Sequence, residues 1–197
     1  MDIAEFIRSI DPFDLLVVLV LAALFILGFI QGTIRRLLGL ASILFSFFLA
    51  ANLREPLGKF LGPNWSQFPA EYSEMVGFGT VFVAATLAFS LVIQAFYTKM
   101  PLFPKYTVID ELLGGLLGLV QGVLLFGVMI IVLDSFFQLQ GIAPRPGELP
   151  VLRDLFNAYD NSFTAELFRE TLIPAFFAVA APLIPSDLRA VFPGSAG

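Results

Sequence analysis

The 197-residue chain contains no cysteine and no histidine. The lack of cysteine excludes disulfides, thiolate metal sites and cysteine nucleophiles. Because histidine is the commonest general base and a common metal ligand, its absence excludes histidine-based triads and HExxH zinc sites. Basic charge is also scarce: 11 Lys and Arg against 16 Asp and Glu give a net charge of −5, whereas nucleic acid requires a basic surface. We therefore expect no catalytic residue, no cofactor, no metal and no nucleic-acid partner.

Apolar residues, in contrast, make up 58% of the chain. They are gathered in runs at about residues 13–30, 37–53, 75–97 and 112–133, each long enough for a membrane-spanning helix. The acidic start of the chain lacks the basic region of a secretory signal, so we expect the first run to be retained. The sequence predicts an all-α integral membrane protein whose four transmembrane helices form two antiparallel hairpins in the lipid bilayer.

The first two spans are separated by a very short connection near Gly32. Arg35 and Arg36 follow it at once, and we expect both side chains to snorkel to the lipid headgroups. After the second span, apolar residues at helical spacing predict a short, separate surface helix over residues 53–61.

The fourth span begins with Thr107 and Asp110, which resemble helix-start signals. It then carries Gly114, Gly118 and Gly122 in one i, i+4, i+8 row. Such a row lets another helix backbone approach closely in lipid. Two interpretations follow: a face that slides or dimerises, and close packing inside one bundle, which the small-residue rows of the second and third spans favour.

Two Gln–Gly pairs of the chain each follow a glycine at the same spacing, as Gly28 precedes Gln31–Gly32 and Gly118 precedes Gln121–Gly122. Two related helical hairpins and coincidence explain this equally well. Gln121 lies deep in the fourth span, and Gln94 lies similarly in the third. A polar residue at such depth faces the bundle or a water path, so each glutamine makes an interhelical hydrogen bond or lines a translocation path. The first interpretation is the simpler one.

Asp14 and Asp134 fall at helix ends on one side of the membrane. We interpret both as solvated markers of the membrane boundary.

The chain divides into a four-span membrane domain, residues 1–135, and a C-terminal segment, residues 136–197. The second part begins with a Pro/Gly-rich linker at 141–147. An amphipathic helical segment follows over 152–167, with a break near residues 160–162. The last apolar run, 172–184, is shorter than the roughly 20 residues that a membrane span needs, which favours an interfacial or re-entrant segment.

Charges in the short loops set the orientation. The first and third loops share one side and carry Arg35, Arg36, Lys99 and Lys105. By the positive-inside rule this side is cytoplasmic, so both termini are predicted to be extracytoplasmic.

These motifs resemble the colicin V production protein family of bacterial inner-membrane proteins. The resemblance covers about residues 13–135 and is carried by the segment from Gly28 to Arg35 and by the Asp–Gly–Gly–Gly spacing of the fourth span. It implies four spans, a link to colicin V export and to envelope homeostasis, and no established catalytic activity. The family often has arginine where this chain has Gln31, Glu111 and Gln121.

The sequence therefore favours a non-enzymatic scaffold or export accessory that packs against itself or other membrane proteins. The alternative is a small channel or transporter subunit, with Gln94 and Gln121 along the path of an unidentified solute. The candidate packing and family-motif residues are Gly28, Gly32, Arg35, Asp110, Gly114, Gly118, Gln121 and Gly122.

Overall fold

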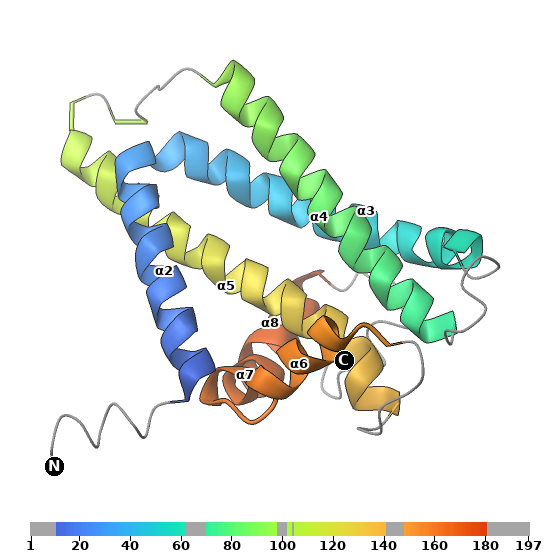
Figure 1. The fold of residues 1–197 in the computed structure, drawn as a ribbon. Helices are drawn as coiled ribbons and strands as arrows, with labels where there is room; N and C mark the ends of the chain where they lie inside the picture. The colour runs from blue at the N-terminus through green and yellow to red at the C-terminus, as the bar shows by residue number, and fades with distance from the viewer. Residues whose placement is uncertain (1–10, 62–69, 98–101, 104, 141–147, 181–197) are drawn as a thin grey trace, which may run out of the picture.

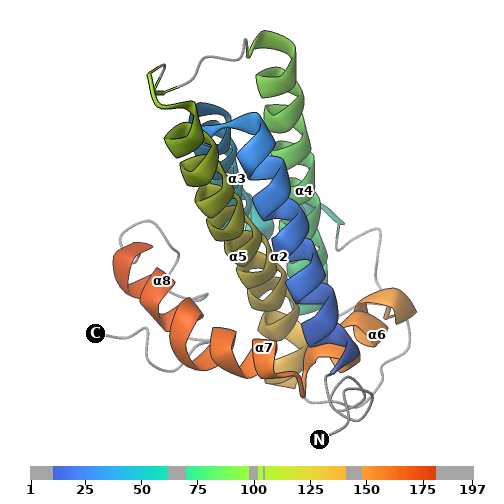
Figure 2. The ribbon, with the colours of Figure 1, turned by 90° about the vertical axis from the view of Figure 1, so that its left-hand side faces the viewer.

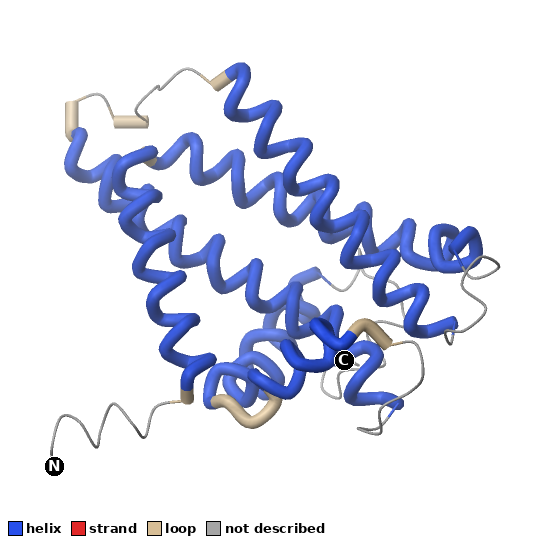
Figure 3. The backbone as a smooth tube through the Cα atoms, in the orientation of Figure 1, coloured by secondary structure: helices blue, strands red, loops and turns tan. Residues whose placement is uncertain are grey.

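The computed structural model describes residues 11–61, 70–97, 102–103, 105–140 and 148–180. Within these ranges the chain is helical and has no strand (Figure 3). Four helices are long and apolar enough to cross a membrane, which confirms the predicted class. They are α2 (Pro12–Gln31), α3 (Thr33–Leu61), α4 (Ala70–Phe96) and α5 (Thr107–Gln140). Shorter helical segments follow: α6 (Pro150–Tyr159), α7 (Phe163–Leu167), the π-helical turn η2 (Phe168–Leu172) and α8 (Ile173–Ala180).

Local sequence signals set both ends of α2. The Asp11 side chain accepts a hydrogen bond from the Phe13 N–H at 2.7 Å, and Pro12 occupies the first helical turn, where no hydrogen-bonded N–H is needed. Gly32 ends the helix with φ of +80°, a left-handed conformation that favours glycine. Since α3 begins at Thr33, the predicted tight connection is a single residue.

The second span is longer than predicted. Helix α3 continues through Pro56 to Leu61, so the prediction of a separate surface helix over 53–61 is wrong. Packing against α4 explains the continuation: Gly58 lies against Glu74, and Leu57 lies against Gly77. Tertiary contact thus outweighs the helix-breaking tendency of proline.

The long helices pair across the sequence. Helix α2 packs along α5, and α3 packs along α4, whereas α2 and α3 diverge from their shared turn (Figure 1). Helix α3 also contacts α5 and joins the two pairs. Figure 2 shows the four long helices side by side, with α6 and α7 across the end of the bundle opposite that turn. The two predicted antiparallel hairpins, each formed by two spans that are adjacent in the sequence, are compatible with this arrangement.

The C-terminal helices contribute residues to the same buried core as the long helices. A turn at residues 160–162 separates α6 from α7, which confirms the predicted break. The linker at 141–147 and the end of the last apolar run lie outside the described residues, and α8 within that run has only eight residues. Large aromatic side chains fill this end of the bundle: Phe47, Tyr72, Phe136, Phe137, Phe156, Tyr159 and Phe177 are fully buried.

Candidate functional site

A close crossing of α2 and α5 contains most of the family-motif glycines. A Cβ atom added at Gly118 would lie 2.2 Å from the carbonyl oxygen of Leu24, and one at Gly28 would lie 2.2 Å from that of Gly114. Both distances are far inside van der Waals contact, so only glycine allows the backbones to approach this closely. Gly122 extends the same face against Leu21 and Leu24. This glycine row therefore packs against another helix of the same chain.

Asp110 joins the start of α5 to the turn between α2 and α3. Its carboxylate accepts the backbone N–H of Leu102 at 3.0 Å, and its backbone carbonyl accepts the Thr33 hydroxyl at 2.8 Å. A Cβ at Gly32 would lie 2.6 Å from the Asp110 carboxylate. Asp110 thus ties the loop before α5 to the α2–α3 turn.

A polar cavity of about 200 Å³ lies next to this crossing. All four long helices contribute to its walls, and its polar lining consists of Gln31, Arg35, Arg36, Ser90, Gln94 and Gln121. The two Gly–x–x–Gln–Gly segments meet at the crossing, since Gly118 lies against Gly28, and both of their glutamines reach the cavity. Whether these segments are an internal repeat stays a prediction.

Arg36 is the buried charge of this cavity. It is 5% exposed, and its Nη1 donates a hydrogen bond of 2.6 Å to the side-chain oxygen of Gln121. The expectation that the Arg36 side chain extends outward to the lipid headgroups is therefore wrong, because the Gln121 amide holds the guanidinium inside the bundle. Gly39 leaves room for this contact, since a Cβ there would lie 3.3 Å from the Gln121 amide nitrogen. Arg35 is half-buried and lines the same cavity.

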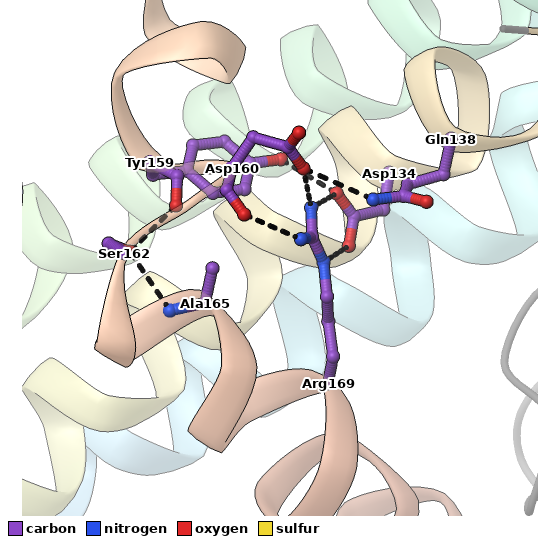
Figure 4. Close-up of polar contacts among 7 residues, drawn as sticks. All are labelled: Asp134, Gln138, Tyr159, Asp160, Ser162, Ala165 and Arg169. Carbon is purple, nitrogen blue, oxygen red and sulfur yellow. Dashed lines mark hydrogen bonds and ion pairs between the residues drawn. The ribbon is translucent and has the colours of Figure 1, made fainter.

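A second polar cluster lies at the opposite end, where α5 meets the C-terminal helices (Figure 4). Asp134 is 1% exposed, so the interpretation of this residue as a solvated boundary marker is wrong. Both of its oxygens accept hydrogen bonds from Arg169 at 2.7 Å, and one also accepts the Tyr159 hydroxyl at 2.8 Å. Arg169 also pairs with the Asp160 carboxylate at 2.9 Å. Every charge in the cluster has a partner.

The environment of this cluster shifts two pKa values. Burial, followed by the negative charge of Asp134, raises the pKa of Tyr159 far above its usual value. Burial alone would lower the pKa of Arg169, but hydrogen bonds and charge from Asp134 and Asp160 raise it overall. Tyr159 therefore stays neutral and Arg169 stays charged at physiological pH.

Asp14 also differs from its predicted role. Its carboxylate accepts the backbone N–H groups of Phe163 and Thr164, at 3.1 and 2.9 Å. These are free N–H groups at the start of α7, whose other cap is Ser162 bonded to the Ala165 N–H. Asp14 thus fastens α7 to the first span. No pattern in the sequence revealed this contact, because the partners lie about 150 residues apart.

The described residues contain no group of three Asp or Glu side chains that could hold a metal ion. The chemistry available at the two clusters is hydrogen bonding and charge pairing. Tyr159 and Arg169 were not selected from sequence, and Arg36 was selected only as a snorkelling and orienting charge, because each acquires its role from a partner distant in the chain.

Comparison with known proteins connects these features. A family model described as colicin V production protein matches residues 13–171. The match extends beyond the predicted 13–135 and includes α6, α7 and Arg169. Neither curated proteins nor solved structures gave a match. Because the model covers most of the chain and the structure has four candidate membrane spans, this multi-pass membrane protein belongs to the colicin V production protein family.

Proposed function

We propose that the protein is a non-catalytic scaffold or accessory of export, in the manner of colicin V production, with a role in envelope homeostasis. Its place in this proposal is the bacterial inner membrane. Membership of a family that is not a known enzyme family supports the non-catalytic assignment, as does a sequence without histidine or cysteine.

The observation that carries the proposal is an apolar groove between α4 and α5. It has a volume of about 610 Å³. Its α4 and α5 residues belong to candidate membrane spans, and Leu149 and Leu152 of the C-terminal segment also line it. The α4 wall of the groove carries three small residues, Gly79, Thr80 and Ala84, among larger apolar ones, and small residues allow a second transmembrane helix to approach closely. The Thr80 hydroxyl already bonds to the Val76 carbonyl at 2.8 Å, so the wall offers no free polar group.

The occupant we propose is an apolar transmembrane helix of another membrane protein. In contrast to the α5 glycine row, which α2 covers, this α4 wall is left open by the chain's own helices. A scaffold that acts by helix packing needs such an open surface on its packed helical bundle.

Crosslinking in native membranes tests the groove. The chain has no cysteine of its own, so Ala84→Cys introduces a single reactive thiol in the groove. Ala23→Cys, on the exposed side of α2 outside any described cavity, is the matched control. We expect a discrete crosslinked protein of fixed mass with Ala84→Cys and none with Ala23→Cys. Equal crosslinking of the two variants, or a crosslink only to a second copy, would contradict a partner-binding groove.

The polar cavity favours a second candidate, a small channel or transporter subunit. Gln94 and Gln121, which the sequence singled out as possible path residues, line the same cavity. This candidate predicts that Gln121→Ala abolishes a measured solute flux and leaves the Ala84→Cys crosslink unchanged. A flux through Gln121→Ala equal to that of the wild type would contradict this candidate function.

We also propose that both termini are extracytoplasmic. The turn beside Arg35 and the loop that contains Lys105 lie at the same end of the bundle, as the orientation by positive charge requires. A thiol at Lys105→Cys should react with a membrane-impermeant reagent only after the membrane is opened to the cytoplasmic side. Reaction from outside intact cells would reverse the orientation.

A further inference from the structure

The cavity of Arg36 contains a charge that the protein does not neutralise. The Arg36 guanidinium has one hydrogen-bonded side chain, Gln121, and its buried Nε has no partner. Within the described residues, no carboxylate lies at ion-pair distance from Arg35 or Arg36. A buried charge without a counter-charge costs several kcal/mol, and more so within a bilayer. The arrangement is therefore incomplete without an anion.

The groups around the cavity match a phosphate. The two arginines supply guanidinium donors, three glutamine amides and the Ser90 hydroxyl supply neutral donors, and no described carboxylate lines the wall. The Gln121 oxygen is already used by Arg36, which leaves its NH₂ group as a donor. Guanidinium groups bind phosphate oxygens with short, charge-assisted hydrogen bonds. A volume of about 200 Å³ accommodates such a group.

The position of the cavity indicates how the phosphate arrives. Gln31 is the last residue of α2, and Gln94 lies near the end of α4 at Phe96, so the cavity sits at the ends of membrane-spanning helices. Lipid headgroups lie at the level of Gln31 and Gln94, and the cavity extends from there to Gln121 inside the fourth span. Leu87 and Leu91 also line the cavity on α4 and are 59% and 64% exposed, which gives an acyl chain an apolar surface directly beside the polar donors.

We infer that the Arg36 cavity is a binding site for a phosphate group, presented by a membrane phospholipid whose acyl chain lies along Leu87 and Leu91. Basic pockets between transmembrane helices are a known way to bind lipid phosphates. The site goes beyond the scaffold role and does not depend on it, because its donors Arg36, Gln94 and Gln121 lie outside the α4–α5 groove, although Leu87 lines both.

Native mass spectrometry of the full-length protein in detergent tests the inference. Phosphatidylglycerol is the probe, and diacylglycerol with the same acyl chains is the phosphate-free comparison. Arg36→Gln should weaken phosphatidylglycerol binding by about tenfold, which corresponds to roughly 1.4 kcal/mol, and should leave diacylglycerol binding unchanged. Lys105→Gln is the matched control, because Lys105 is an exposed cation at the same end of the bundle and outside the cavity.

A second variant and a competition with inorganic phosphate complete the test. Gln94→Leu removes a neutral donor from an exposed position, so it tests the site even where Arg36→Gln fails to fold, and it should weaken phosphatidylglycerol binding by roughly threefold. Inorganic phosphate should compete only weakly. Arg36-dependent binding of inorganic phosphate as tight as that of the lipid would overturn the lipid source. Equal phosphatidylglycerol binding by wild type, Arg36→Gln and Gln94→Leu would overturn the site itself.

Discussion

The two ends of the bundle handle a buried charge in opposite ways. At the C-terminal end, Asp134 accepts hydrogen bonds from Tyr159 and Arg169, and aromatic side chains surround the cluster. At the end with the α2–α3 turn, Arg36 has Gln121 as its partner, an unbonded Nε and a polar cavity beside it. The Asp134 cluster at the first end is completed by the chain itself, and the Arg36 guanidinium at the second end leaves hydrogen-bonding capacity unused.

This difference separates a charge cluster that maintains the structure, around Asp134, from a charge that is available to a ligand, on Arg36. A buried pair with all its hydrogen bonds made contributes a fixed geometry, and breaking it is costly because the remaining partner stays buried. A buried cation without its anion lowers the stability of the isolated protein and gives a ligand something to bind. The α2–α5 glycine crossing lies next to the Arg36 cavity and sets how closely α2 and α5 approach there.

We expect the largest loss of stability at the end of the bundle that contains the Asp134 cluster. Asp134→Ala leaves Arg169 and Tyr159 without their shared acceptor, so we expect a loss of about 3–5 kcal/mol in the free energy of unfolding. Denaturant unfolding in detergent measures it. Glu55→Ala is the control, because the Glu55–Lys59 pair is exposed and should contribute almost nothing. Equal stability of the two variants would show that the cluster does not hold the C-terminal helices.

A smaller loss of stability is expected at the α2–α5 glycine crossing. Gly118→Ala places a Cβ against the Leu24 carbonyl and should cost about 1–3 kcal/mol through overpacking. Gly79→Ala is the same change on α4, where the nearest atom to the new Cβ is 3.9 Å away. That control should be neutral or gain up to about 1 kcal/mol from helix propensity. A loss of similar size in both variants would contradict the close crossing.

Stability at alkaline pH tests the environment of Tyr159 in the Asp134 cluster. The pKa of Tyr159 is raised in the folded protein by burial and by Asp134, whereas a tyrosine in the unfolded chain ionises near 10.0. Above that pH the unfolded chain binds fewer protons, so stability falls with rising pH by about 1.4 kcal/mol per pH unit. Tyr159→Phe should remove this part of the slope between about pH 10 and pH 11. An unchanged slope would contradict a buried, neutral Tyr159.

The smallest effect on stability is expected at the incomplete end. Arg36→Met removes one hydrogen bond to Gln121 but also removes a buried charge without a counter-ion. Without added phospholipid, the free energy of unfolding should change by no more than about 1 kcal/mol. Arg169→Met, the same change at the other end, should cost several times as much. A large loss with Arg36→Met would show that the protein itself already stabilises this charge.

Sequence was sufficient for the architecture because long apolar runs, turn glycines and small-residue rows are local signals. They predicted four spans, the tight turn at Gly32 and the break after α6. They did not predict the continuous α3, because contacts of Leu57 and Gly58 with α4 carry the helix past Pro56.

These local signals did not identify the partners of the buried charges. Arg36 and Gln121 are 85 residues apart, and Asp134 and Arg169 are 35 apart, so no periodicity links them. Gln121 was selected from sequence because it is polar and deep in a span, but the cation that bonds to it was assigned to the membrane surface. Depth in a span identified one member of the site, and only the fold identified the other.

Thermal unfolding in lipid nanodiscs compares the two ends directly. Wild type, Arg36→Gln and Arg169→Gln are each measured in phosphatidylglycerol nanodiscs and in nanodiscs of a phosphate-free glycolipid. We expect phosphatidylglycerol to raise the Tm of the wild type and of the less stable Arg169→Gln by similar amounts, and to leave the Tm of Arg36→Gln unchanged. A Tm increase in Arg36→Gln as large as that in the wild type would contradict a bundle that is closed by its own helices at one end and completed by a lipid phosphate at the other.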